Sequence, residues 1–373
     1  MFHKNNCFLL SLLLLGVLVS GCGNSADPEM VDEGAAQFSR EDFPQNQEIT
    51  LTPFPAELNE NFPDMRVYED YIFMLGHYGN YALKVYSRAD SAWLGDLVPR
   101  GTGPGESIGF ASFFPGTEEG VYIGYDITVG QFLKVDLNAW QQNPEKYVAE
   151  VMFRVDGNLQ NLYGITSAPT YDGYAGLSFN LDDARIYIFD STNQVSQRIG
   201  QLPPVPADWP QERDEDFPVS LRARAHEGAV LAHPSEPWLV YLGSKKDEIR
   251  IYKDTTEVKH LIGPEQYPFS LTLGKSGERF IPAPSADTHF TYTKGLTVTE
   301  EYLILPWSGT PYADRFVQIQ EILVLSWDGE PVTRITWENN ITTLGVWATD
   351  GKLEIFGVDA ATGKMMTGTA VLP

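Results

Sequence analysis

The sequence has 373 residues, and its 50 acidic side chains against 26 basic ones give a formal charge of −24. Such a field repels nucleic acid and anionic lipid surfaces, so the composition excludes a nucleic-acid-binding protein and favours neutral or cationic partners. Aromatic residues make up 12% of the chain, which also contains 33 glycines and 25 prolines; this composition favours strands and turns over a helical bundle.

The N-terminus is typical of a lipoprotein signal. Lys4 provides a positive charge before the apolar run of residues 8–20, which is shorter than the about 20 apolar residues of a membrane span. Two small residues then precede Cys22 directly at the end of this run. We therefore expect residues 1–21 to be removed as a signal peptide and the thiol of Cys22 to carry a lipid, the alternative being an ordinary signal peptide with a chance cysteine.

The segment after the signal is predicted to be a tether. Cys7 is lost with the signal, so Cys22 is the only cysteine of the mature chain and no internal disulfide can form. Gly23 favours the outer membrane, without indicating which face. Residues 22–46 are polar and acidic, which predicts a flexible tether of about 25–30 Å. We expect residues 47–373 to form the folded domain.

The folded region is predicted to consist of short strands joined by polar turns. Six segments share one pattern, in which an alternating strand is followed by a turn rich in Asp, Asn or Gly and then by a second strand. These segments begin at Ala82, Gln131, Arg185, Glu248, Glu321 and Lys352. A further strand precedes five of them, starting at Tyr71, Gly120, Gly173, Trp238 and Glu301. Asp328-Gly329 marks the clearest hairpin, because glycine allows the positive φ that a tight turn requires.

Six units of three or four strands predict an all-β fold, a six-bladed β-propeller. Radial packing buries both faces of each sheet and leaves only short outer edges. Residues 48–52 are expected to close the ring as an outer strand of the last blade, beside the C-terminal run 366–372. The irregular stretches 203–218 and 263–288 are expected on one rim. Two β-sandwich domains in series remain an alternative, although no linker rich in Pro, Gly and Ser divides the chain near its middle.

Four stretches resemble, in the same order, motifs of the TolB-like six-bladed propeller lipoproteins. They are the turn Arg100–Glu106, the strand pair within Tyr125–Leu137, the strand Thr299–Gly309 and the hairpin Glu321–Gly329. Pro306 departs from the family pattern where a strand residue is usual, which suggests an edge or a bulge. The resemblance implies a propeller fold and an anchored location. It implies no catalytic residue, because the fold does not fix the function.

The sequence contains one pattern typical of a catalytic serine. Residues 105–109 match Gly-x-Ser-x-Gly around Ser107, but a nucleophile elbow needs a strand before the serine and a helix after it. A glycine-rich loop precedes Ser107 here, so we interpret the segment as a turn between blades. Glu106 stands where a phosphate-binding loop has lysine. The histidines lack zinc-motif spacing, and the acidic stretches 182–183 and 212–216 lack the pattern of a calcium loop, so we assign no catalytic, cofactor or metal residue.

Aromatic residues near the irregular loops are the candidate ligand contacts. Trp209, Trp307 and Tyr312, with Arg315 nearby, could line a rim, since exposed aromatics stack on sugars or anchor peptides; alternatively they pack between blades. We expect an outer-membrane-anchored binding or scaffolding module for a protein, peptide or glycan. The alternatives are a propeller hydrolase or lyase that acts on a polysaccharide with acids in its channel, and a purely structural role in the envelope.

Overall fold

The computed structural model describes residues 34–55, 64–76, 79–155, 157–159, 162–179, 182–203, 220–267, 270–276, 279–314, 317–349 and 351–373. All of them belong to a unit of residues 32–373, whereas residues 1–31 form a separate unit outside the described part. The predicted signal peptide and Cys22 therefore lie outside the described residues. Among the described residues, no helix is both long and apolar enough for a membrane span.

Three antiparallel four-stranded sheets come first in the chain. The first contains β4 (Asp64–Tyr68), β5 (Tyr71–Leu75), β6 (Tyr81–Ser87) and β7 (Trp93–Pro99). The second contains β8 (Ser112–Pro115), β9 (Val121–Asp126), β10 (Gln131–Asp136) and β11 (Glu150–Arg154). The third contains β12 (Leu162–Ala168), β13 (Gly173–Ser178), β14 (Ala184–Phe189) and β15 (Val195–Gln201). Each is a meander of sequential strands, as the repeated strand–turn–strand pattern predicts.

Two larger sheets and one hairpin follow. The fourth sheet contains β16 (Gly228–Ala232), β17 (Trp238–Gly243), β18 (Glu248–Lys253), β19 (Thr256–Ile262) and β1 (Ala36–Gln37). An eight-stranded sheet contains β22 (Thr297–Val298), β23 (Tyr302–Trp307), β24 (Ile319–Ser326), β25 (Pro331–Thr349), β26 (Lys352–Asp359), β27 (Met365–Val371) and β3 (Thr52–Pro53), and β2 (Gln45–Glu48) pairs with β25. The hairpin is β20 (Leu271–Ser276) with β21 (Arg279–Pro284).

Strand β25 divides the eight-stranded sheet into two groups. Its residues 331–336 pair with β24, and its residues 341–349 pair with β26. In the described part of the chain, short helices lie between strands: α1 (Leu137–Gln142), α2 (Ser220–Ala225), and the 3-10 turns η1 (Arg40–Asp42), η2 (Gly157–Leu159), η3 (Pro169–Tyr171) and η4 (Tyr312–Asp314). The single long strand was not predicted from the sequence, because the pattern identified only its first half, as the second strand of the segment that begins at Glu321.

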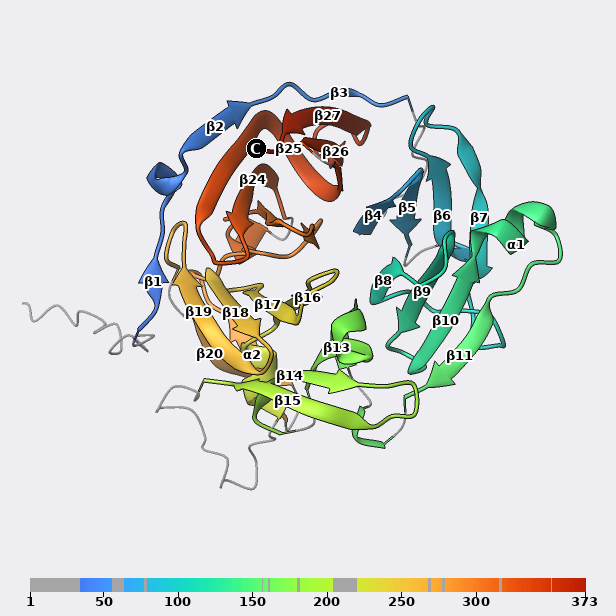
Figure 1. Ribbon diagram of the computed structural model, residues 1–373, viewed down its shortest axis with the longest axis horizontal. Coiled ribbons are helices and arrows are strands. Elements are labelled where there is room, and N and C mark those ends of the chain that lie inside the picture. Colours follow the sequence, from blue (N-terminus) through green and yellow to red (C-terminus); the bar gives the residue numbers. More distant parts are fainter. Residues whose placement is uncertain are drawn as a thin grey trace, which may run out of the picture. The chain divides into compact units, whose positions relative to one another are not determined.

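The sheets stand around a common centre and pack face to face (Figure 1). Between the first two sheets, Phe73 lies 5.0 Å from Phe113 and 4.6 Å from Tyr122, measured between ring centres. Ile188 of the third sheet shares a buried cluster with Tyr241 of the fourth. This arrangement confirms the predicted all-β propeller and contradicts the alternative of two β-sandwiches. Each sheet buries both of its apolar faces because an adjacent sheet packs against each of them.

Residues 34–55 form a segment that we call the N-terminal strap. It follows the outer edges of the later strands, with β1 parallel to β19, β2 parallel to β25, and β3 antiparallel to β27 (Figure 1, blue). Phe38 and Phe43 are 4% and 3% exposed. Residues 34–46 were predicted to belong to the flexible tether. That part of the prediction is wrong, because the two phenylalanines anchor an otherwise polar segment.

Residues 48–52 were predicted to form an outer strand beside the C-terminal run. The strand that pairs there, β3, contains only Thr52 and Pro53. Pairing with β27 occurs at Thr52 and Pro53, opposite Thr367 and Met366. Glu48 instead pairs with β25, opposite Thr336. The strap therefore contacts two strands of the eight-stranded sheet in succession.

Two local predictions concern the eight-stranded sheet. Gly329 has φ 78°, so the Asp328-Gly329 turn has the predicted positive φ. Pro306 pairs with Ile322 without a register shift, so the sheet has no bulge there. On its other side, β22 pairs only with Leu303 and Ile304, so no described strand pairs with β23 at Pro306 on that edge. Proline is tolerated at such a position because no ladder hydrogen bond requires its missing N–H.

Candidate functional site

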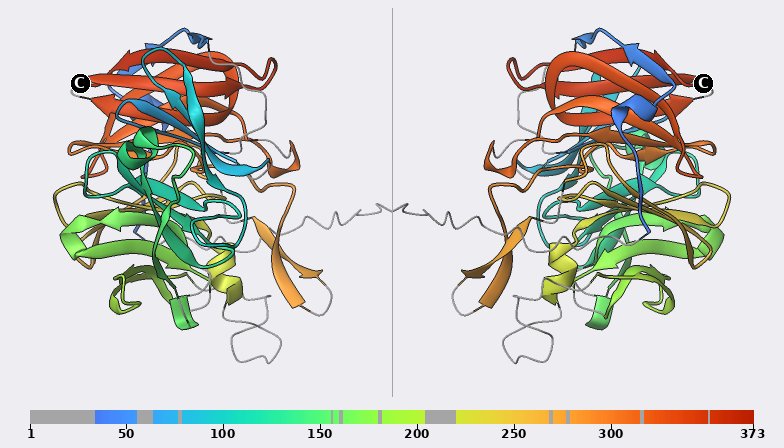
Figure 2. Two further views of the ribbon diagram at one scale, coloured as in Figure 1. Left: turned by 90° about the vertical axis from the view of Figure 1, so that its right-hand side faces the viewer. Right: turned by 90° about the vertical axis from the view of Figure 1, so that its left-hand side faces the viewer.

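The β20–β21 hairpin projects from one side of the ring and contacts α2 (Figure 2). Beside the base of the hairpin, residues 288–290 pair with residues 310–312 of the β23–β24 connection. Phe290 N–H donates to Thr310 O at 2.8 Å, and Tyr312 N–H donates to Thr288 O at 2.8 Å. These bonds join two connections that are distant in sequence into one ribbon.

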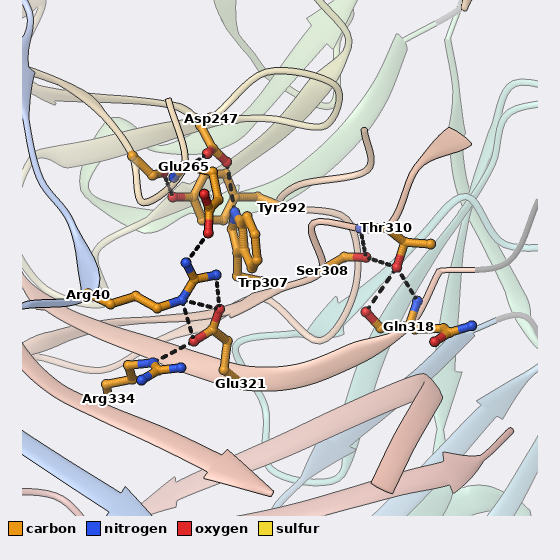
Figure 3. Close-up of polar contacts among 11 residues, drawn as sticks. Arg40, Asp247, Glu265, Tyr292, Trp307, Ser308, Thr310, Gln318, Glu321 and Arg334 are labelled. Atoms are coloured by element: carbon orange, nitrogen blue, oxygen red, sulfur yellow. Dashed lines mark hydrogen bonds and ion pairs between the residues drawn. The ribbon is translucent and has the colours of Figure 1, made fainter. Parts of the chain in front are cut away.

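Side-chain hydroxyls fix this ribbon to its surroundings. The Thr288 hydroxyl donates to Ser270 O at 3.0 Å and accepts the Ser285 N–H at 2.9 Å, which ties the ribbon to both ends of the hairpin. The Thr310 hydroxyl accepts the Gln318 N–H at 3.0 Å and thereby closes the other loop (Figure 3). Thr288 is 0% exposed and Thr310 7%. The ribbon is therefore held by buried hydrogen bonds and is preorganised to present its outer side chains.

Four aromatic rings lie on or beside this ribbon, and we call them the loop platform: Tyr267, His289, Phe290 and Tyr312. Tyr267 stacks on His289 with 4.0 Å between ring centres and 1° between planes. Phe290 lies 4.9 Å from Tyr312. Tyr312 is 36% exposed and the other three are partly buried. The platform thus offers aromatic surface to solvent on a rigid backbone.

Trp307 lies beneath the platform, and its polar edge points to a buried carboxylate. Its ring is 6.1 Å from that of Tyr267 and nearly parallel to it. Its indole N–H donates to Asp247 Oδ1 at 2.7 Å, and Asp247 Oδ2 accepts the Glu265 N–H at 2.9 Å (Figure 3). Asp247 is fully buried, and burial raises its pKa to about 7 although these hydrogen bonds act to lower it. The carboxyl group therefore titrates near neutral pH.

Arg40 of the N-terminal strap also lies over the ring of Trp307. Its guanidinium lies 4.7 Å from the ring centre. Nε and Nη2 donate to Glu321 Oε1 at 3.0 and 2.7 Å, and Nη1 binds Glu265 (Figure 3). Arg334 Nε also donates to Glu321, at 2.6 Å. Burial alone would lower the pKa of Arg40, but the two carboxylates raise it, so this residue remains charged.

The structure brings together only part of the aromatic rim predicted from the sequence. Trp307 is 5% exposed and its N–H is occupied, so it supports the platform instead of facing a ligand. Tyr312 does face solvent. Trp209 and Arg315 lie outside the described residues. Sequence reasoning missed Tyr267, His289 and Phe290, because their proximity depends on pairing between two irregular loops, which leaves no periodic signal.

The Ser107 segment is a turn between the first and second sheets, as interpreted from the sequence. Ser107 is 0% exposed, and its hydroxyl donates to Asp126 Oδ2 at 2.8 Å. Asp126 also accepts the Ile108 N–H at 2.6 Å. Gly105 has φ 72°, and a side chain there would lie 2.6 Å from the carbonyl oxygen of Ala149. This serine is a structural residue that fixes the turn to β9.

Asp182 of the acidic stretch 182–183 and the buried His233 both have structural partners. Asp182 accepts a hydrogen bond from Arg198 Nε at 2.7 Å, and residues 212–216 lie outside the described part. His233 is 4% exposed, and its Nδ1 accepts the N–H groups of Ser235 and Glu236. These contacts fix the turn between β16 and β17. Within the described ranges, no group of three or more His, Cys, Asp or Glu residues is arranged to hold a metal ion.

Meander sheets that stand around a common centre define the chain as a β-propeller protein. The sequence matches the TolB-like 6-blade propeller-like family over residues 61–349, and the chain belongs to that family. This confirms the resemblance found in the sequence motifs. No curated protein matches the sequence significantly.

Two crystal structures share the fold at low sequence identity. A "Putative exported protein" from Bacteroides fragilis is similar with a TM-score of 0.51 and 10% identity, covering 91% of this chain and 100% of that one. A member of the DUF4221 family from Bacteroides vulgatus is similar with a TM-score of 0.53 and 9% identity, covering 87% of this chain and 98% of that one. At this level of identity the likeness concerns the fold alone.

Proposed function

We propose that this protein is a lipoprotein of the outer membrane, anchored through Cys22, whose propeller binds a protein, peptide or glycan partner through the loop platform. The single observation that supports this most is the exposed Tyr312 and its neighbour Phe290, held on a ribbon with buried hydrogen bonds. Aromatic side chains supply large contact areas at low entropic cost, and rigid aromatic anchors dominate the energy of many interfaces. The platform has both properties.

The anchored location rests on the sequence and on one similarity. Cys22 follows two small residues at the end of an apolar run of 13 residues, 8–20. The similar Bacteroides fragilis protein carries the description of an exported protein. We include in the proposal a ring of six blades, in which the two groups joined by β25 count as separate blades and the pairing of β3 with β27 closes the ring.

The carboxylates beneath the platform favour binding over hydrolysis. Glu265 and Glu321 both bind Arg40, and Asp247 accepts hydrogen bonds from an indole and from the backbone. A glycosidase needs one free acid and one free base or nucleophile on either side of the scissile bond. These three acids are instead used to hold the N-terminal strap and Trp307 in place.

Alanine variants of the platform test the proposal. Wild type, Tyr312→Ala and Phe290→Ala are purified with the anchor intact from solubilised membranes, and bound proteins and glycans are quantified. The matched control is Trp93→Ala, which removes a more exposed aromatic, 60% exposed, from the outer strand β7. We expect each platform variant to lose most of the bound partner, roughly tenfold or more for an aromatic hot spot, and Trp93→Ala to retain it. Equal capture by all four proteins would contradict the proposal.

A further inference from the structure

Two exposed acids lie at one end of the ribbon that carries the loop platform. The ribbon is antiparallel, and in it Tyr312 N–H donates to Thr288 O at 2.8 Å. In this register the residues that follow Tyr312 lie opposite those that precede Thr288. Asp287 and Asp314, both exposed, are therefore at the same end of the ribbon, beside the exposed Tyr312.

The carboxylates of these two acids are available to a partner. Only the backbone N–H groups of the two residues make local bonds, from Asp287 to Ser285 Oγ at 3.1 Å and from Asp314 to Pro311 O at 3.0 Å. Within the described ranges, which leave out the neighbouring Arg315, neither carboxylate accepts a hydrogen bond or forms an ion pair.

The described cations around the platform are either balanced or remote. Arg40 binds both Glu265 and Glu321, so two carboxylates balance its charge. Lys275 and Arg279 lie at the tip of the β20–β21 hairpin, about 13 Å along the strands from its base. The exposed end of the ribbon therefore combines an aromatic ring with two unpaired negative charges.

We propose that the loop platform binds a basic segment of a protein, rich in arginine or lysine. This inference rests on the proposed function and names the chemistry of its partner. A cation lies over the exposed ring of Tyr312, and its N–H groups donate to Asp287 and Asp314. Arginine fits best, because a guanidinium stacks on a ring while its N–H edge remains free for carboxylates.

The charge of the chain favours a basic protein segment over a glycan. A neutral sugar would leave the two carboxylates without an ionic partner, and an acidic sugar would be repelled by them. The formal charge of −24 also favours the approach of a cationic partner and opposes that of an anionic one.

Labelled hexaarginine tests this charge requirement, with hexaglutamine as the neutral reference. Binding to the purified intact mature protein is measured by fluorescence anisotropy at low and high salt. We expect saturable binding of hexaarginine that weakens with salt, and none of hexaglutamine. Tyr312→Ala and the double variant Asp287→Asn/Asp314→Asn should each weaken hexaarginine binding roughly fivefold.

The matched control is Asp254→Asn/Asp328→Asn, which removes the same charge from two exposed acids in hairpin turns. These turns follow the ends of β18 and β24, whereas the platform lies near the starts of these strands, so this variant should bind hexaarginine like the wild type.

Three outcomes would overturn the inference: equal affinity of the wild type for both peptides, equal affinity of the two double variants for hexaarginine, or wild-type affinity in Tyr312→Ala. If Tyr312→Ala nevertheless loses the partner captured from membranes, the proposed function stands and the partner is not basic. If the platform variants also retain that captured partner, the proposed function itself fails.

Discussion

The guanidinium of Arg40 lies over the Trp307 ring at 4.7 Å, so a residue of the N-terminal strap directly contacts the tryptophan that supports the loop platform. Both residues also bind acids of the same network, Arg40 through Glu321 and Trp307 through Asp247. Phe38 and Phe43 of the strap belong to the same buried cluster as Trp307. The N-terminal strap, which follows the predicted lipid anchor in the sequence, is thereby packed against Trp307, the residue that supports the loop platform.

Replacing Arg40 with alanine should loosen the strap. Glu321 is 5% exposed and would keep, among the described residues, only Arg334 as its charged partner, so we expect a loss of about 2 kcal/mol in the free energy of unfolding. Hydrogen exchange should show faster opening at the amides of Phe38 and Ile49, which bond to Ile262 and Thr336. Arg40→Lys keeps the charge but not the paired hydrogen bonds, so an intermediate effect is expected. If the hydrogen-exchange rates of these amides were unchanged in Arg40→Ala, Arg40 would not hold the N-terminal strap in place.

The stability of the protein should depend on the ionisation of Asp247. Its pKa is about 7 in the folded protein, against an ordinary value of 3.8, so the folded state binds the proton more tightly between these two values. The contribution of Asp247 to stability is therefore complete below about pH 4 and decreases as the pH rises to about 7, by at most about 1.4 kcal/mol per pH unit. Asp247→Asn should remove this slope. Urea unfolding of both proteins from pH 4.5 to 8 measures it, and parallel curves would count against a buried, titrating Asp247.

The turn that contains Ser107 should respond to substitution as a structural element. Asp126 accepts hydrogen bonds from the Ser107 hydroxyl and from the backbone of Ile108 and Thr128. We expect Ser107→Ala to cost about 1 kcal/mol and Asp126→Asn about 2–3 kcal/mol in denaturant unfolding, because hydrogen bonds to a charged acceptor are stronger. Partner capture should be unchanged in both variants. A large loss of binding in a Ser107→Ala protein of normal stability would instead indicate a functional serine.

The lipid anchor can be tested by removing its thiol. In Cys22→Ala, no diacylglyceryl group can be attached, so we expect the protein to leave the outer-membrane fraction. Mass spectrometry of the wild type should locate the lipid on Cys22 at the mature N-terminus. Recovery of the alanine variant in the membrane fraction at the wild-type level would mean that another feature holds the protein there.

The sequence was sufficient to predict elements whose information is local. The strand predicted from Glu321 and the Asp328-Gly329 turn follow from side-chain alternation and from the φ requirement of a tight turn. Both occur, although the strand begins two residues earlier, at Ile319. The helix α1 was missed, although Asp136 caps it by accepting the Ala139 N–H at 2.9 Å. Six residues are too few for a helical period to emerge from the sequence.

Features that depend on contacts between distant segments could not be predicted in this way. The strap is polar in sequence, and its packing is decided by where Phe38 and Phe43 meet Tyr292 and Trp307. Tyr312 was recognised because it is an aromatic residue near a loop, but its partner Phe290 depends on the pairing of residues 288–290 with 310–312. Local patterns therefore predicted the strands of the ring, whereas the candidate site arises from its connections.

Site-specific photo-crosslinking in intact cells tests the central claim most directly. A photoreactive phenylalanine analogue replaces Tyr312 on the loop platform or, as the matched control, Trp93 on the outer strand β7, and the crosslinked adducts are identified after irradiation. We expect one reproducible macromolecular adduct from position 312 and no such adduct from position 93. An adduct from position 93 alone, or no adduct from position 312 in a correctly folded protein, would contradict binding through the loop platform.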